Sequence, residues 1–309
     1  MPDKCDIRWF KQTFHEKIDA ALLGTPFTLD FMTALACQET GHVWSILRKK
    51  DFSLDRILEL CVGDTIDAPN RKAFPKNKAA LVAFSNGQEM FDLAHQALVD
   101  MAQFIPGFKA AASKPNKFCH GYGIFQLDLQ FFEEDPDYFL QKRFANFNDS
   151  LQKALGELQE ARKKIGLENK STLSDLELAH VAIAYNTGGF KPEKKLKQGF
   201  QSSDGKFYGE QIFEFLQTAK TVPIQDETTM LPFTIDANGP RFKVTATKLN
   251  LRTEPCAGSA SASNIKARLK KGDIVQALTN QAVRGFLEVE TVEPNGLKGF
   301  ASLEFLAQV

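Results

Sequence analysis

The sequence predicts an α+β protein, in which a mainly helical domain is followed by a small all-β domain. Apolar residues recur at helical spacing from about residue 6 to residue 220. From Phe242 onward the pattern changes to short β-like runs separated by Gly, Pro, Asn and Ser. Between the two, residues 221–240 contain Pro and Gly and show no helical period, which is typical of a linker. We therefore expect domains at residues 1–220 and 241–309.

The first helices are predicted by an apolar stripe and by capping residues. Phe10, Phe14, Ile18 and Leu22 recur at four-residue steps, so a helix should end near Gly24. The pair Thr25-Pro26 is typical of a helix start, and this second helix should stop near Gly41. Further helices are expected at residues 53–63, 88–104, 138–164, 174–188 and 210–220, of which 138–164 should be mostly exposed.

The all-β domain is expected to be a small barrel, because about 69 residues hold several short strands. The strands are predicted at residues 243–247, 249–252, 274–277, 286–292 and 299–302.

Composition excludes several classes of protein. Of the 309 residues, 43% are apolar and 25% are charged, which is ordinary for a globular chain and unlike collagen, disulfide-dense or largely disordered proteins. The 38 basic residues balance the 38 acidic ones, so net charge does not suggest a nucleic-acid partner. The C-terminal 69 residues hold ten basic and six acidic residues. No run of 18 apolar residues occurs, so we expect no membrane span.

Three segments place polar residues at the ends of predicted elements. Glu39 ends a helix of mostly apolar residues, and a desolvated carboxyl group there would have a raised pKa suited to a general acid. The segment HGYGIFQLD (residues 120–128) has two glycines that permit close approach of a ligand. The segment AYNTGG (residues 184–189) ends a later helix. Taken singly, these segments are equally compatible with a solvated helix end, a glycine turn and a helix cap.

In this order the three segments resemble the lysozyme-like family, namely goose-type lysozymes and soluble lytic transglycosylases, over about residues 20–220. The resemblance implies that Glu39 is the general acid. It implies that Asp128, two residues after Gln126, holds the water. The implied substrate-binding residues are Gly121, Tyr122, Gly123, Gln126, Tyr185 and Asn186.

The chain departs from the family pattern in two respects. About 20–30 residues usually separate the Glu from the glycine segment, whereas residues 43–119 intervene here, and this insertion should add helices beside the cleft. A second water-positioning Asp is expected shortly before the glycine segment, where Asn116 and Lys117 stand instead. Asp64 and Asp67 in the insertion are candidates for that role, with ordinary turn aspartates as the alternative.

The C-terminal domain resembles a bacterial Src-homology-3-like cell-wall domain. LNLRTEP (residues 249–255), LKKGDIV (269–275) and GFA (299–301) carry the resemblance, which implies binding of wall peptides; a barrel used only for packing is the alternative. Phe286 and Phe300 stand where the family often has Trp, which puts ligand stacking in question.

The expected function is cleavage of the β-1,4 bond between N-acetylmuramic acid and N-acetylglucosamine in peptidoglycan. Hydrolysis follows if Asp128 or Asp64 positions water; without a held water, a lytic transglycosylase gives 1,6-anhydro products. A helical chitinase and a non-catalytic wall-binding protein are the other interpretations. The expected partners are peptidoglycan glycan strands and stem peptides.

No metal site or cofactor is expected, because the chain has no CxxC pair and no HExxH spacing. Sequence leaves open whether the five cysteines form one disulfide; Cys37 and Cys119, each two residues before a motif, could approach one another. His42 and His120 are expected to line the cleft. No signal peptide is visible although the substrate lies in the periplasm or outside the cell. Three kinds of protein would fit this combination: a phage endolysin, an effector delivered by a secretion machine, and a chain trimmed of its leader. Secretion machinery or an immunity protein would then be a further partner.

Overall fold

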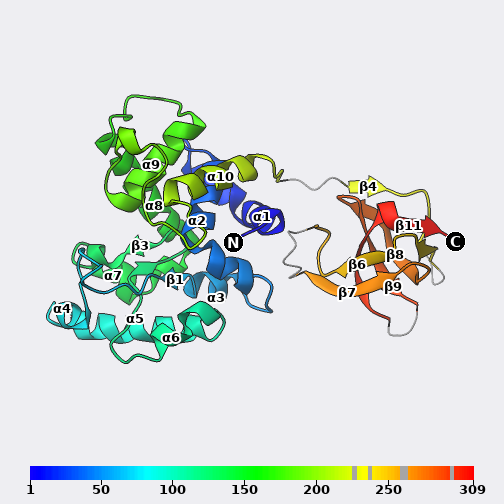
Figure 1. The fold of residues 1–309 in the computed structure, drawn as a ribbon, viewed down its shortest axis with the longest axis horizontal. Coiled ribbons are helices and arrows are strands. Elements are labelled where there is room, and N and C mark those ends of the chain that lie inside the picture. Colours follow the sequence, from blue (N-terminus) through cyan, green and yellow to red (C-terminus); the bar gives the residue numbers. More distant parts are fainter. Residues whose placement is uncertain (225–227, 236–238, 258–263, 293–295) are drawn as a thin grey trace. The chain divides into compact units, whose positions relative to one another are not determined.

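The computed structural model describes residues 1–224, 228–235, 239–257, 264–292 and 296–309, and its fold is α+β as predicted (Figure 1). Helices occupy the N-terminal part and an antiparallel sheet the C-terminal part. The chain divides into two compact units. The first comprises Met1–Pro2 and Thr13–Val222, and the second comprises Asp3–Gln12 and Pro223–Val309. The division after Val222 lies close to the predicted boundary.

The helices are α1 (Lys4–Ala21), α2 (Leu29–Leu47), α3 (Leu54–Glu59), α4 (Lys78–Val82), α5 (Gly87–Ala102), α6 (Lys109–Ala112), α7 (Pro136–Leu140), α8 (Phe147–Lys164), α9 (Asp175–Thr187) and α10 (Tyr208–Lys220). The four apolar residues of the predicted first stripe are all buried, three of them in α1 and Leu22 directly after it. Ser174 and Glu177 form the predicted capping box of α9, and Gly188 ends that helix with a positive φ of 77°.

Three details of the helix prediction are wrong. Helix α2 is capped by Thr28, whose Oγ1 accepts from Phe31 N–H; Thr25 instead donates its hydroxyl to Leu22 and closes the turn after α1. Helix α2 also continues past Gly41 to Leu47. Glycine is required at position 41 for packing rather than for a cap, because a Cβ there would lie 2.3 Å from Cγ of Pro2.

The segment predicted as one exposed helix over residues 138–164 is two helices. Helix α7 ends at Leu140, and Lys142 then takes a positive φ of 53°. Asn146 opens α8 by accepting the backbone N–H groups of Asn148 and Asp149. Helix α8 is amphipathic rather than mostly exposed. Its buried residues are Phe147, Ser150, Leu151, Ala154, Leu155, Leu158 and Ala161.

A small antiparallel sheet joins the insertion to the glycine segment within the first unit. It consists of β1 (Val62–Gly63), β2 (Gly121–Tyr122) and β3 (Leu127–Asp128), in that order. Gly63 pairs with Gly121, and Gly121 pairs with Asp128. Strand β1 lies within residues 43–119, so the insertion is hydrogen-bonded directly to the predicted catalytic hairpin.

The second unit is built on an antiparallel sheet with strand order β11-β5-β8-β9-β10-β6-β7, and β4 also pairs with β8. The strands are β4 (Thr228–Met230), β5 (Arg241–Val244), β6 (Lys248–Arg252), β7 (Ile265–Lys270), β8 (Ile274–Val283), β9 (Phe286–Thr291), β10 (Lys298–Ser302) and β11 (Leu306–Gln308). All five predicted strands are present, whereas β4, β7 and β11 were not predicted. This strand order defines an antiparallel sheet, and the barrel stays a prediction.

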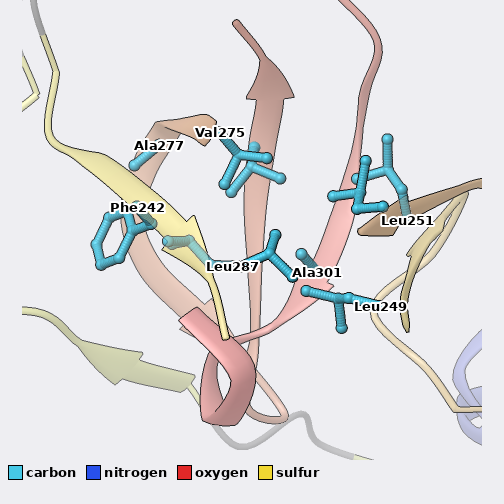
Figure 2. Close-up of a cluster of buried hydrophobic side chains, with 10 residues drawn as sticks. Phe242, Leu249, Leu251, Val275, Ala277, Leu287 and Ala301 are labelled. Carbon is cyan, nitrogen blue, oxygen red and sulfur yellow. The ribbon is translucent and has the colours of Figure 1, made fainter. Parts of the chain in front are cut away.

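The sheet encloses a core of alternating inward side chains, among them Phe242, Leu249, Val275 and Leu287 (Figure 2). Part of the predicted linker belongs to this unit, because Thr228–Met230 forms β4 and the side chains of Leu231 and Phe233 pack against the core. Residues 225–227 and 236–238 of the linker lie outside the described residues.

Cysteine pairing is resolved within the second unit, where Cys5 and Cys256 form a disulfide. Cys37, Cys61 and Cys119 are free and buried, so the expected approach of Cys37 to Cys119 does not produce a disulfide. Within the described ranges, no helix is long and apolar enough to cross a bilayer.

Candidate active site

The first unit contains a cleft with a volume of about 670 Å³, which is in the range usual for ligand sites. Side chains from α2, the segment after β1, the β2–β3 hairpin, α8 and α9 line it. Most of the residues singled out in the sequence meet here: Glu39, Asp64, Gly121, Gln126, Asp128, Tyr185 and Asn186. Most of the lining residues are polar or charged, which suits a ligand that carries many hydroxyl and amide groups.

Glu39 lies inside helix α2, not at its end, and its residue is half-buried in the cleft wall. Burial of the carboxyl group raises its pKa from 4.5 to about 7, although a hydrogen bond from Tyr208 lowers it in part. A carboxyl group with this pKa is protonated in about half of the molecules at neutral pH, as a general acid requires.

Tyr208 is the direct partner of Glu39, and the sequence analysis did not identify it. This residue begins α10, and its Oη donates to Glu39 Oε1 at 2.6 Å while its ring is buried. The hydrogen bond fixes one carboxyl oxygen and leaves Oε2 as the position from which a proton can be delivered. The two residues are 169 positions apart, so no local sequence pattern connects them.

Asp64 and Asp128 are brought together by Arg71, which the sequence analysis also did not identify. Arg71 Nη1 lies 3.3 Å from Asp64 Oδ2 and 3.0 Å from Asp128 Oδ2, and Nη2 lies 2.6 Å from Asp128 Oδ1. The remaining guanidinium N–H groups donate to the carbonyl oxygens of Phe74 and Pro75. Arg71 is therefore buried with every donor satisfied, as a buried cation needs.

Both aspartates nevertheless remain partly accessible from the cleft. The side chains of Asp64 and Asp128 are 35% and 28% exposed. Asp128 Oδ1 also accepts the backbone N–H of Gln130, and Asp64 Oδ1 accepts that of Ile66. Each carboxylate is thus oriented by two partners, and each retains lone pairs that can accept from a ligand or a water. Asp67 does not line the cleft; its carboxylate pairs with Lys117 at 2.8 Å.

Gln126 braces the glycine hairpin from inside. Its Nε2 donates to the carbonyl oxygens of Gly123 (2.8 Å) and Cys61 (3.3 Å). A Cβ at Gly121 would lie 2.4 Å from Gln126 Oε1, and one at Gly63 would lie 2.7 Å from it. Gly63 and Gly121 are therefore needed so that the Gln126 side chain can cross the small sheet. Because Nε2 is occupied by two carbonyl oxygens, the predicted contact of Gln126 with a ligand would fall mainly to Oε1.

Two of the predicted substrate-binding residues do not reach the cleft. Tyr122 is fully buried, and its hydroxyl donates to the carbonyl of Cys119. Gly123 has a positive φ of 78°, and a Cβ there would lie 2.6 Å from Ser150 Oγ. Alternation along β2 explains the position of Tyr122, because Gly121 faces the cleft and its neighbour Tyr122 faces the core. Gly123 follows the strand and packs against Ser150 instead. Both residues support the hairpin rather than touch a ligand.

Tyr185 and Asn186 lie in the last turn of α9 and line the cleft as predicted. Tyr185 Oη donates to the carbonyl of Phe125 at 2.6 Å, which ties α9 to the glycine hairpin. Asn186 is exposed, so its amide is available to a ligand.

Helix α8 and a loop aromatic add residues that were not predicted. Glu157, Glu160 and Lys164 of α8 line the cleft, and burial is the main cause that raises the pKa of half-buried Glu157. Their spacing puts them on one stripe of α8, beside the buried stripe of that helix. Phe200 also lines the cleft and is 71% exposed. An aromatic ring in this position offers a flat apolar surface to a sugar ring.

The two cleft histidines that were predicted have different positions. His42 lines the cleft and stacks on Phe108, with ring centroids 5.9 Å apart. His120 is fully buried, and its Nδ1 lies 3.2 Å from the carbonyl oxygen of Asp64. It therefore supports the segment after β1 and does not line the cleft. Within the described part of the chain, no group of three or more His, Cys, Asp or Glu side chains is placed to hold a metal ion.

Comparison with known proteins identifies no relative. No protein-family model, no curated protein and no solved structure matches the chain.

Proposed function

We propose that the protein cleaves the β-1,4 bond between N-acetylmuramic acid and N-acetylglucosamine in peptidoglycan, with Glu39 as the general acid. The observation that carries this proposal is the Glu39 carboxyl group, with a pKa of about 7 and one oxygen held by Tyr208 at the wall of a polar cleft. Such a group can protonate the leaving glycosidic oxygen near neutral pH. The choice of peptidoglycan as the substrate depends on the order of the three segments at Glu39, residues 120–128 and residues 184–189. The cell wall is the proposed site of action.

Hydrolysis is the proposed outcome, because the carboxylates of Asp128 and Asp64, which Arg71 brings together, share the cleft with Glu39. Asp128 and Asp64 would accept hydrogen bonds from a water and direct it at the anomeric carbon, from the face opposite the leaving oxygen. Arg71 would act as a positioning residue that keeps the two carboxylates side by side. In this scheme Glu39 gives its proton to the leaving glycosidic oxygen as that bond breaks, and the water passes one proton to the Asp128 or Asp64 carboxylate as the new C–O bond forms.

The second candidate function is lytic transglycosylation, and one observation favours it. Both oxygens of Asp128 already accept from the Arg71 guanidinium. Fewer lone pairs of this carboxylate are then left to hold a water. The 6-hydroxyl of the muramic acid would then attack in place of water and give a 1,6-anhydro product.

Product analysis on purified wall sacculi tests both candidates. The wild-type chain should clear sacculi, and the Glu39→Gln variant should lose about 10²–10⁴-fold in rate, because glutamine cannot donate the proton. Mass spectrometry should find reducing-end muramic acid products, and Asp128→Asn and Asp64→Asn should each slow their formation. Mainly anhydro products, with both Asn variants still fast, would reject hydrolysis in favour of transglycosylation.

Two controls separate the remaining interpretations. Chitin oligosaccharides serve as the second substrate, and faster cleavage of these than of sacculi would support a chitinase. A folded wild-type chain that pellets with sacculi and yields no product would support a non-catalytic wall-binding protein. We propose wall binding for the second unit as well, on the strength of the motifs in its strands.

A further inference from the structure

The outer face of strands β6 and β7 is strongly basic. Along both strands, apolar side chains point into the core, as Figure 2 shows for Leu249 and Leu251, and the alternate residues point outward. Neither strand contains an Asp or Glu. The outward positions of this face, which we term the basic face, include five cations: Lys248, Arg252, Lys266, Arg268 and Lys270.

The strand register places these charges close to one another. Lys248 pairs directly with Lys270, and Asn250 pairs directly with Arg268. Like charges that face each other across two strands destabilise a sheet. Within the described part of the chain, none of the five cations forms an ion pair, whereas carboxylates pair with many lysines and arginines of the first unit. Arg252 donates to Asn264 Oδ1 and Lys266 donates to the carbonyl oxygen of Lys298, but both acceptors are neutral. The concentration of unneutralised positive charge indicates that the face serves a ligand.

Protection of a sheet edge does not account for the pattern. Lysines commonly guard edge strands against aggregation, and β7 does end the strand order. Strand β6, however, pairs with β7 along its length and with β10 at Arg252. Arg252 therefore has no edge to protect.

The spacing of the cations points to a polymer with closely repeating negative charges. Outward residues on one strand are about 7 Å apart, and neighbouring strands are about 4.8 Å apart. Two of the five cations are arginines, which bind phosphate oxygens in a fork geometry. We propose that the basic face binds an anionic wall polymer built of sugar-phosphate or polyol-phosphate repeats. The choice of a wall polymer rests on the proposed function; the binding of a polyanion does not.

The disulfide in the same unit favours a wall polymer over nucleic acid. Disulfides such as Cys5–Cys256 persist mainly in oxidising compartments and are rare in the cytosol and nucleus. In such compartments the common polyanions are polymers of the cell envelope. Phosphate contacts also make binding sensitive to salt, since each contact releases counterions.

The test uses the full-length chain with Glu39→Gln, so that the wall is not degraded during the measurement. Pelleting is compared on sacculi that retain their phosphate polymers and on sacculi stripped of them by hydrofluoric acid. The test variant is Arg268→Gln with Lys270→Gln on β7. Its matched control is Arg241→Gln with Lys243→Gln, which removes the same two exposed charges at the same spacing from β5.

The β7 variant should bind intact sacculi roughly thirtyfold more weakly, if each cation contributes about as much as a basic residue at an anionic surface. The slope of log K against log salt concentration should become less steep by about 1.4 in the β7 variant. The β5 control should keep both the affinity and the salt slope of the parent chain. Stripped sacculi should bind poorly. Equal losses in the two double variants, or equal binding to both wall preparations, would overturn the proposal.

Two further probes address other polyanions. Tighter binding to double-stranded DNA or to vesicles of anionic lipid than to intact sacculi would also overturn the proposal. Because the test measures only binding, its outcome is separate from that of the catalytic proposal. A wild-type chain that releases no product, combined with selective loss of binding in the β7 variant, would reject the catalytic proposal and retain this one.

Discussion

Replacement of Glu39 by glutamine should stabilise the protein, and the stabilisation should grow as the pH rises from 4.5 to 7. The pKa of Glu39 is about 7 in the folded chain against an ordinary value of 4.5. Below pH 4.5 the group is protonated in both the folded and the unfolded state and contributes nothing. As the pH rises to 7, the unfolded chain ionises more readily, so the folded state loses relative stability.

The magnitude follows from the pKa difference. At about 1.4 kcal/mol for each pKa unit, ionised Glu39 costs the folded state about 3 kcal/mol above pH 7. Glutamine removes this cost and can still accept the hydrogen bond from Tyr208. The free energy of unfolding of Glu39→Gln should therefore match that of the wild type near pH 4 and exceed it by about 3 kcal/mol at pH 8.

Chemical denaturation followed by circular dichroism at 222 nm, at intervals from pH 4 to pH 8, measures this difference. Glu160→Gln is the control for removal of a cleft carboxyl group, because Glu160 lines the same cleft but is exposed. A stability difference for Glu39→Gln that is constant across the range, or that falls as the pH rises, would refute the inference that burial keeps this carboxyl group protonated.

The remaining predictions concern three other features. Tyr208→Phe removes the hydrogen bond that lowers the pKa of Glu39, so the ¹³C NMR titration of the Glu39 carboxyl group should move to higher pH by about one unit; Tyr185→Phe, which loses only a bond to a backbone carbonyl, should move it much less. Phe200→Ala should change stability by no more than about 0.5 kcal/mol, because the ring is exposed, yet raise KM for soluble glycan several-fold; an unchanged KM would exclude Phe200 from binding. Iodoacetamide should label no cysteine in the native chain, three after denaturation and all five after reduction, and five labels without reductant would disprove the disulfide.

The fold class and most of the helices could be predicted because their signals are local. The stripe from Phe10 to Leu22 and the Ser174–Glu177 capping box each lie within a few turns of one helix. Strand β7 was missed although Ile265–Lys270 alternates perfectly, because its outward residues are all cations and resemble an ordinary charge run. Thr25 and Thr28 precede the same helix, and only the hydrogen bond to Phe31 distinguishes the cap.

The candidate site was predictable only where its residues belong to motifs. Glu39, Asp128 and Tyr185 were found through the ordered segments, and all three line the cleft. Arg71 and Tyr208 act through contacts that span 57 and 169 residues, so no spacing rule could reveal them. Tyr122 was assigned to the cleft as part of its motif, although alternation along β2 directs its side chain into the core.

The long reach of the Glu39–Tyr208 and Arg71–Asp128 contacts has a consequence for folding. A chain must close large loops before either contact can form, and that entropy is lost before the contact energy is gained. The cleft should therefore be assembled late, after α1, α8 and α9 have formed from local interactions. During synthesis, a chain that has not yet extended past residue 208 lacks the partner of its acid. The same long-range contacts should be among the first to open in the native state, so hydrogen exchange at the cleft should outpace exchange in the helices around it.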